Sequence, residues 1–167
     1  MNWTPEGAAE LARYDCHSCG GSGLAGGEPC ACVCRRVFQV CYRRFRVCAE
    51  ADAFARLVTF RENRRGVDRH LMWIRRNEDY CADFQAAARR VLSPQLYRVF
   101  GFYHLLGAAA DLVAGRLSIS RSVLYGMVAE IEERVGRELA LMQPYSLYPP
   151  RAYLGLIAHG PSRARAL

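Results

Sequence analysis

The chain has 167 residues, of which 51% are hydrophobic and 23% are charged, a composition that is globular and excludes a disordered protein. All 23 basic residues are arginine, and the formal net charge is +7. No apolar stretch reaches the roughly 18 residues of a membrane span, and residues 1–10 lack the apolar core of a signal peptide. We therefore expect a cytoplasmic protein without a membrane segment.

The charge is unevenly distributed along the chain. Residues 1–34 contain one arginine against four acidic residues, whereas residues 35–76 contain twelve arginines against four. A basic middle segment favours a polyanionic partner, and the alternative is a solvated helix face. Arginine suits phosphate and guanine because its planar guanidinium group donates two parallel hydrogen bonds.

Residues 16–34 are rich in cysteine and glycine and contain too few apolar side chains for a core of their own. Cys16 and Cys19 are separated by two residues, and after ten further residues come Cys30 and Cys32. Two close pairs of thiols are the arrangement that tetrahedral zinc requires. Clustered cysteines in a cytosolic protein are typical of metal ligands, so a structural zinc ion is predicted on these four residues.

Other uses of these cysteines stay open. Cys34 can replace Cys30 or Cys32 as a ligand, and His17 is a weaker candidate. Redox chemistry and a knot held by disulfides are the alternatives to a metal. Residues 16–23, Cys-His-Ser-Cys-Gly-Gly-Ser-Gly, resemble one C-x-x-C-x-G-x-G unit of the DnaJ cysteine-rich domain. That resemblance implies a zinc knuckle and not a co-chaperone, because the chain has no His-Pro-Asp loop of a J-domain.

A basic helix is predicted next, over about residues 35–57, where apolar residues recur at spacings of three and four with arginines between them. A polar loop is predicted over residues 61–69, which include Gly66. Asn77 or Asp79 is the expected cap of the following helix. The arginines of the basic helix that we expect to contact phosphate are Arg35, Arg36, Arg43 and Arg44.

Three further helices are predicted after residue 92. Ser93-Pro94 opens the first, with serine as its cap and proline at the first helical position. The second covers about residues 108–117, with Leu112, Val113 and Leu117 pointing inward. The third covers about residues 121–141 and is joined to the second by a short connection.

The start of the last predicted helix carries the strongest functional signal. Ser120 is its expected cap, and Arg121, Ser122 and Tyr125 lie on the face opposite the apolar stripe. A recognition helix presents its N-terminal residues to the major groove of DNA in this way. We therefore predict that these four residues bind double-stranded DNA.

The segment 92–139 resembles region four of bacterial sigma factors and related regulators. The correspondence runs through Leu92-Ser93-Pro94, residues 100–107, residues 111–121 and residues 128–139. It implies a helix-turn-helix, in which Ser118 replaces the usual glycine of the turn. The last helix is acidic at Glu130, Glu132 and Glu133, and these carboxylates must face away from phosphate. A region-two pattern is missing upstream, so a complete sigma factor is not implied.

These patterns together predict a mostly α-helical bundle. Its parts are a zinc knuckle (1–34), a basic helical segment (35–91), a helix-turn-helix (92–143) and a proline- and aromatic-rich tail (144–167). The predicted function is transcription regulation of bacterial or phage type through DNA binding, and not catalysis, because the four histidines lie far apart in the sequence. The alternatives are a zinc-stabilised module that binds protein, for example RNA polymerase, an RNA-binding zinc-knuckle protein, or a helical bundle without a nucleic-acid role.

Overall fold

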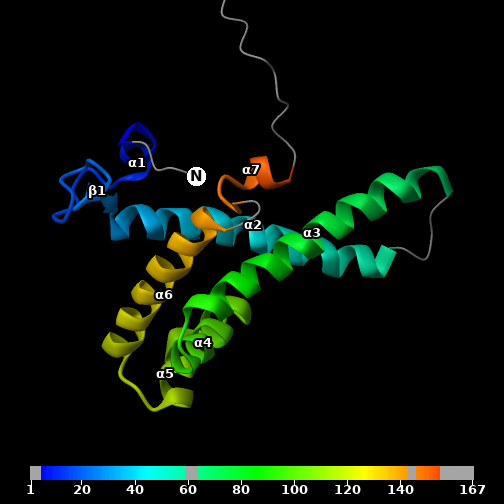
Figure 1. Cartoon of the computed structure of the whole chain (residues 1–167). Coiled ribbons are helices and arrows are strands. Elements are labelled where there is room, and N and C mark those ends of the chain that lie inside the picture. Colours follow the sequence, from blue (N-terminus) through cyan, green and yellow to red (C-terminus); the bar gives the residue numbers. More distant parts are fainter. Residues whose placement is uncertain (1–4, 59–63, 143–145, 155–167) are drawn as a thin grey trace, which may run out of the picture.

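The protein is described by a computed structural model, in which residues 5–58, 64–142 and 146–154 are placed well enough to describe (Figure 1). These residues are mostly helical, as predicted, and the only strands among them form a two-stranded hairpin. The elements are α1 (Pro5–Leu11), β1 (Leu24–Ala25), β2 (Glu28–Pro29), α2 (Ala31–Val58), α3 (Arg64–Val91), α4 (Pro94–Phe100), the π-helical turn η1 (Gly101–Leu105), α5 (Ala110–Leu117), α6 (Arg121–Leu141) and α7 (Pro150–Tyr153).

The core lies where α2 crosses α3 and α6 (Figure 1). Phe45 of α2 stacks on Phe84 of α3, with ring centroids 4.8 Å apart. From α6, a stripe of apolar side chains at helical spacing is fully buried in the core, which α4 and α5 extend at the start of this helix. The stripe consists of Leu124, Ile131, Val135 and Leu139. Among the described residues, no helix has the length and apolar character needed to cross a membrane.

The helix α3 is longer than the sequence predicts. It begins at Arg64, so residues 64–69 are helical and the predicted loop over 61–69 is wrong for them, while residues 61–63 lie outside the described residues. Asn77 and Asp79 lie inside α3 and cap nothing. The single Gly66 costs a helix only about 1 kcal/mol, which packing of a 28-residue helix on α2 can outweigh.

The helices α4, α5 and α6, which follow Leu92, agree with the three helices predicted there. Ser93 accepts a hydrogen bond from the Leu96 amide at 3.3 Å, and Ser120 accepts one from the Val123 amide at 3.2 Å. Between α5 and α6, Ser118 has a φ of 54°, a left-handed conformation that glycine adopts more easily. Leu112 is 70% exposed, so its predicted inward position is wrong. The eight-residue α5 buries the neighbouring Val113 and Ala114 instead.

Candidate metal centre

The glycines of the N-terminal segment let it fold back on itself. Gly26 and Gly27 have positive φ values of 61° and 84° and form the turn between β1 and β2. Two consecutive residues with positive φ are typical of a tight hairpin turn. Gly23 also has a positive φ, and a Cβ there would lie 2.3 Å from the Ala8 carbonyl oxygen of α1. The hairpin therefore returns the chain to the loop that carries the first cysteine pair.

The four predicted cysteines lie together in space. The Sγ atoms of Cys16 and Cys30 are 3.8 Å apart, as are those of Cys19 and Cys32. All four sulfurs lie within 4.8 Å of one another. A tetrahedral ion with metal–sulfur bonds of about 2.3 Å separates its sulfurs by about 3.8 Å, whereas a disulfide bond is about 2.05 Å long. The four cysteines could therefore hold a metal ion.

The surroundings of the sulfurs bear on their protonation. Backbone amides of Cys19 and Ser18 donate to the Cys16 sulfur and lower the pKa of that thiol to about 6. Cys30 immediately precedes α2 and Cys32 lies in its first turn, at the positive end of the helix dipole. Burial nevertheless raises the pKa of Cys32 to about 12 and also raises that of Cys30. A metal ion would displace the protons of such buried thiols.

The two other ligand candidates of the sequence are not part of the four-sulfur cluster. Cys34 is buried, its thiol donates to the Pro29 carbonyl at 3.8 Å, and burial raises its pKa. His17 is exposed at the surface of the loop. Within the described ranges, the cluster with metal-ligand geometry contains neither of these residues.

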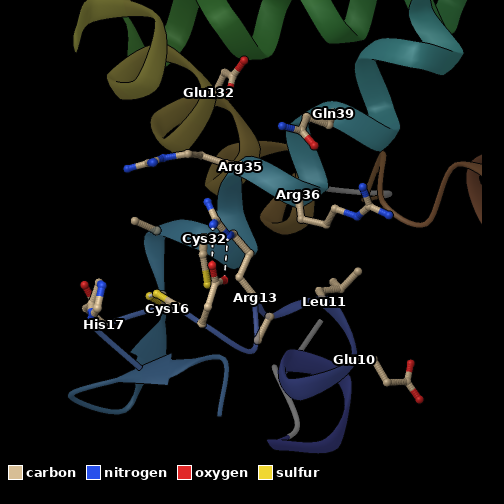
Figure 2. A pocket seen from close by; sticks show the side chains of 15 residues that line it. Glu10, Leu11, Arg13, Cys16, His17, Cys32, Arg35, Arg36, Gln39 and Glu132 are labelled. Carbon is tan, nitrogen blue, oxygen red and sulfur yellow. Dashed lines mark hydrogen bonds and ion pairs between the residues drawn. The ribbon is translucent and has the colours of Figure 1, made fainter. Parts of the chain in front are cut away.

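A cleft of about 780 Å³ opens beside the sulfurs, between the knuckle, the start of α2 and α6 (Figure 2). Its lining carries charges of both signs. Arg13 donates to Asp15 through two nitrogens, at 3.1 and 2.8 Å. Figure 2 shows Arg35 and Arg36 leaving α2 in different directions. Burial raises the pKa of Glu132 on the α6 side of the cleft.

The arginines predicted to contact phosphate fall into two kinds. Arg36 and Arg43 are exposed, and neither has an ion-pair or hydrogen-bond partner among the described residues. Arg35 lies 3.8 Å from Glu133 of α6. Arg44 is half-buried and donates to the side-chain oxygen of Asn77 at 3.2 Å. Half of the predicted set thus takes part in contacts between helices.

The four predicted residues at the start of α6 are exposed. They are Ser120, Arg121, Ser122 and Tyr125. Arg121 forms a two-nitrogen ion pair with Asp111 of α5. This end of α6 lies at the α5–α6 junction, whereas Arg137, near the other end, donates to the Pro29 carbonyl of the hairpin at 3.3 Å (Figure 1). The structure therefore keeps the cysteine cluster and the front of α6 apart.

Three of the four acidic residues of α6 form ion pairs within the chain. Glu130 pairs with Arg134 at 2.6 Å on the same helix. Glu133 lies 3.9 Å from Arg137, and Glu138 lies 3.3 Å from Arg90 of α3. These ion pairs neutralise much of the acidic charge that the sequence places on this helix.

One buried polar residue has no counterpart in the sequence predictions. His104, in η1, is 3% exposed, and its Nε2 atom has no hydrogen-bond partner in the described part of the chain. Phe38 and Tyr42 lie edge-on to its ring, with centroids at 4.9 and 5.3 Å. The burial lowers its pKa to about 4. The only sequence signal was its place one turn after Phe100 on an apolar helix face.

No protein family, curated protein or solved structure matches this chain.

Proposed function

We propose that the protein binds double-stranded DNA through a helix-turn-helix formed by α5, residues 118–120 and α6, and that it regulates transcription in the cytoplasm. The observation that carries this proposal is the exposure of the first turns of α6, immediately after the Ser120 cap. A helix that enters the major groove reads bases with these positions. Its free amides and positive dipole end also favour a nearby phosphate.

The junction between α5 and α6 supports this geometry. The left-handed Ser118 turns the chain sharply, and its amide donates to the Gly115 carbonyl at 3.2 Å. The half-buried Ile119 packs against the core in this turn. The turn therefore holds α6 at a defined angle to α5, as a reading helix requires.

Arg121 is the residue that we expect to read a base. Its ion pair with Asp111 is exposed on both sides, with side-chain exposures of 62% and 66%. Exposed ion pairs contribute little net stability, so the guanidinium group can exchange Asp111 for a guanine edge. Arg36 and Arg43 supply positive charge on α2 for phosphate contacts.

We further propose that the ion on Cys16, Cys19, Cys30 and Cys32 is zinc and that its role is structural. Four thiolates without an open position are typical of a structural zinc site. When bound, zinc would join the loop to the start of α2 and replace a hydrophobic core in residues 16–34. The action of the protein is then binding and not catalysis.

Fluorescence anisotropy with a random duplex in a salt series tests DNA binding. We expect binding at low salt that weakens steeply as salt rises, because arginines release counterions from phosphates. Binding that ignores salt, or that is missing at low salt, would contradict the proposal.

Sequence preference is tested with a duplex that the protein has selected from a random library. Arg121→Gln should weaken its binding by about 5- to 150-fold. The matched variant Arg134→Gln, on the exposed far part of α6, should bind it almost normally.

A protein-binding role is the second candidate, and exposed apolar residues favour it. Leu106 and Leu112, on either side of the start of α5, are 72% and 70% exposed. Exposed apolar side chains that gather in a patch mark interaction sites. If RNA polymerase is the partner, Leu106→Ser and Leu112→Ser should weaken its capture, while Arg121→Gln should leave it unchanged.

A further inference from the structure

A small pocket of about 150 Å³ lies beside the α5–α6 turn. Its walls come from α4, from the end of α5 and from α6, and Figure 1 places α4, α5 and the start of α6 at one end of the molecule. The lining residues are Gln95, Arg98, Arg116, Leu117, Ser118, Ile119 and Met127.

The pocket concentrates positive charge without an acidic partner. Arg98 and Arg116 are both exposed, and neither forms an ion pair with any described residue. The lining contains no carboxylate, unlike the large cleft beside the cysteines, which contains three. Two guanidinium groups that line one small pocket repel each other, and an anion between them would remove that repulsion. Their planar donor groups suit the oxygens of a phosphate.

Neutral donors complete the lining. Gln95 precedes Arg98 by three residues on α4, so both side chains lie on one face of that helix. Ser118 contributes a hydroxyl group, whereas its backbone amide already donates to Gly115. The volume of about 150 Å³ equals roughly five water molecules of about 30 Å³ each, which is enough for one phosphate group.

The pocket opens beside the turn that precedes α6, because Ser118 and Ile119 line it. Met127 in the pocket and Tyr125 are two residues apart, so their side chains leave α6 about 160° apart and the pocket is not on the face that carries Tyr125. A helix in the major groove runs between the two phosphate backbones. A backbone phosphate at the edge of the groove could therefore reach the pocket only from the side of the turn, at Ser118.

We propose that Arg98 and Arg116, with Gln95 and Ser118, form a binding site for a single phosphate group. As a DNA contact this site rests on the proposed function, and the phosphate would then belong to the duplex backbone. The same chemistry can also take a free phosphate, so the experiment separates the two sources.

The first arm titrates the full-length, metal-loaded protein with inorganic phosphate and follows the arginine Nε–Hε signals by NMR. We expect Arg98 and Arg116 to shift together and Arg75 to stay unchanged. Arg75 is the matched control because it is exposed on α3 and lines none of the described pockets. In Arg98→Gln/Arg116→Gln the response should be lost. Circular dichroism should confirm the fold of this variant, since both side chains are exposed.

The second arm measures the salt dependence of binding to a random duplex. The slope of log K against log salt becomes shallower by about 0.9 for each phosphate that the protein no longer neutralises. If both arginines share one phosphate, the slope of the double variant should be shallower by about 0.9, and that of each single variant by less, because the remaining arginine still contacts the phosphate. The control Arg75→Gln should keep the wild-type slope.

The outcomes distinguish this inference from the proposed function. A reduced slope in the double variant assigns the pocket to a backbone phosphate. A phosphate response without DNA binding by the wild type retains the pocket for free phosphate and rejects the DNA-binding function. If phosphate leaves both signals unmoved and the double variant keeps the full slope, the pocket binds no phosphate and the inference is wrong.

Discussion

Gly136 of α6 lies so close to Cys34 of α2 that a Cβ at position 136 would be 1.9 Å from the Cys34 carbonyl oxygen. The same Cβ would lie 3.2 Å from the Cβ of Phe38, one turn further along α2. Only a residue without a side chain allows the two helix backbones to meet in this way. The crossing of α2 and α6 is therefore fixed at one position, four residues after Cys30.

Gly136→Ala should destabilise the protein by about 1–3 kcal/mol, because the backbone of α2 must move to admit a methyl group. Urea unfolding followed by circular dichroism measures this change. Gly126→Ala is the matched control on the same helix, where nothing lies within 4 Å of an added Cβ. It should stabilise the protein by about 0.5–1 kcal/mol through helix propensity. Equal effects of both variants would refute the close-contact explanation.

Purified protein should contain about one equivalent of zinc, and Cys19→Ser should lose it, because three thiolates bind the ion more weakly. Elemental analysis by mass spectrometry measures the content. Cys34→Ala should keep the full equivalent, since that thiol lies outside the cluster. A metal-free wild type, or equal loss in both variants, would contradict the assignment of the four ligands.

Stability should fall as the pH is lowered from about 6.5 to 4, partly because of His104. Its pKa is lowered from 6.5 to about 4 in the folded protein, so between these values the unfolded chain binds more protons than the folded one. The contribution amounts to about 2 kcal/mol at pH 5. In His104→Phe this part of the pH dependence should vanish. Urea unfolding of both proteins at pH 7 and pH 5 tests it, and an unchanged difference would exclude His104 as the cause.

Two neighbouring arginines of α2 should differ in their effect on stability. Arg44→Ala removes one of two donors to the buried side-chain oxygen of Asn77, which Cys48 also contacts at 3.3 Å, and should cost about 0.5–1.5 kcal/mol. Arg43→Ala removes a side chain without an ion-pair partner among the described residues and should change stability by less than about 0.5 kcal/mol. Thermal unfolding measures both variants. For DNA binding we expect the larger effect from the other variant. Arg43→Ala should make the salt dependence of binding shallower by more than Arg44→Ala does.

Asp111→Asn should strengthen binding to random duplex DNA by roughly fivefold, because it removes a negative charge that repels the phosphates of the duplex. It should also reduce the preference for a selected sequence, since Arg121 loses the partner that orients its guanidinium group. Anisotropy with the random and the selected duplex measures both effects. Weaker binding to random DNA would show that Asp111 is needed to position Arg121 and does not compete with DNA.

Local signals in the sequence predicted several elements well. Ser93 and Ser120 mark the starts of α4 and α6 because a capping hydroxyl acts within three residues of its own position. The spacing of the four cysteines likewise identified the cluster, since each pair is set by the chain itself.

Long-range packing was harder to predict. Gly66 and Asn77 indicated a loop and a cap, but both lie within α3, and the Asn77 side chain bonds to α2. Arg44 was predicted to be free for phosphate, because periodicity does not show which face of a helix meets another helix. Leu112 was expected inside for the same reason. The burial of His104 depends on Phe38 and Tyr42, more than 60 residues earlier in the chain.

The contact between Gly136 and Cys34 also connects the cysteine cluster with α6, and through that helix with Arg121 at its start. Cys34 lies within one turn of Cys30 and Cys32 at the start of α2, so loss of the ion would loosen the support on which α6 rests. From Gly136 to Arg121 the helix extends about 22 Å, at 1.5 Å per residue. A tilt of about 5° at the support would move the far end by about 2 Å. The metal content of the protein would in this way determine the position of the Arg121 side chain.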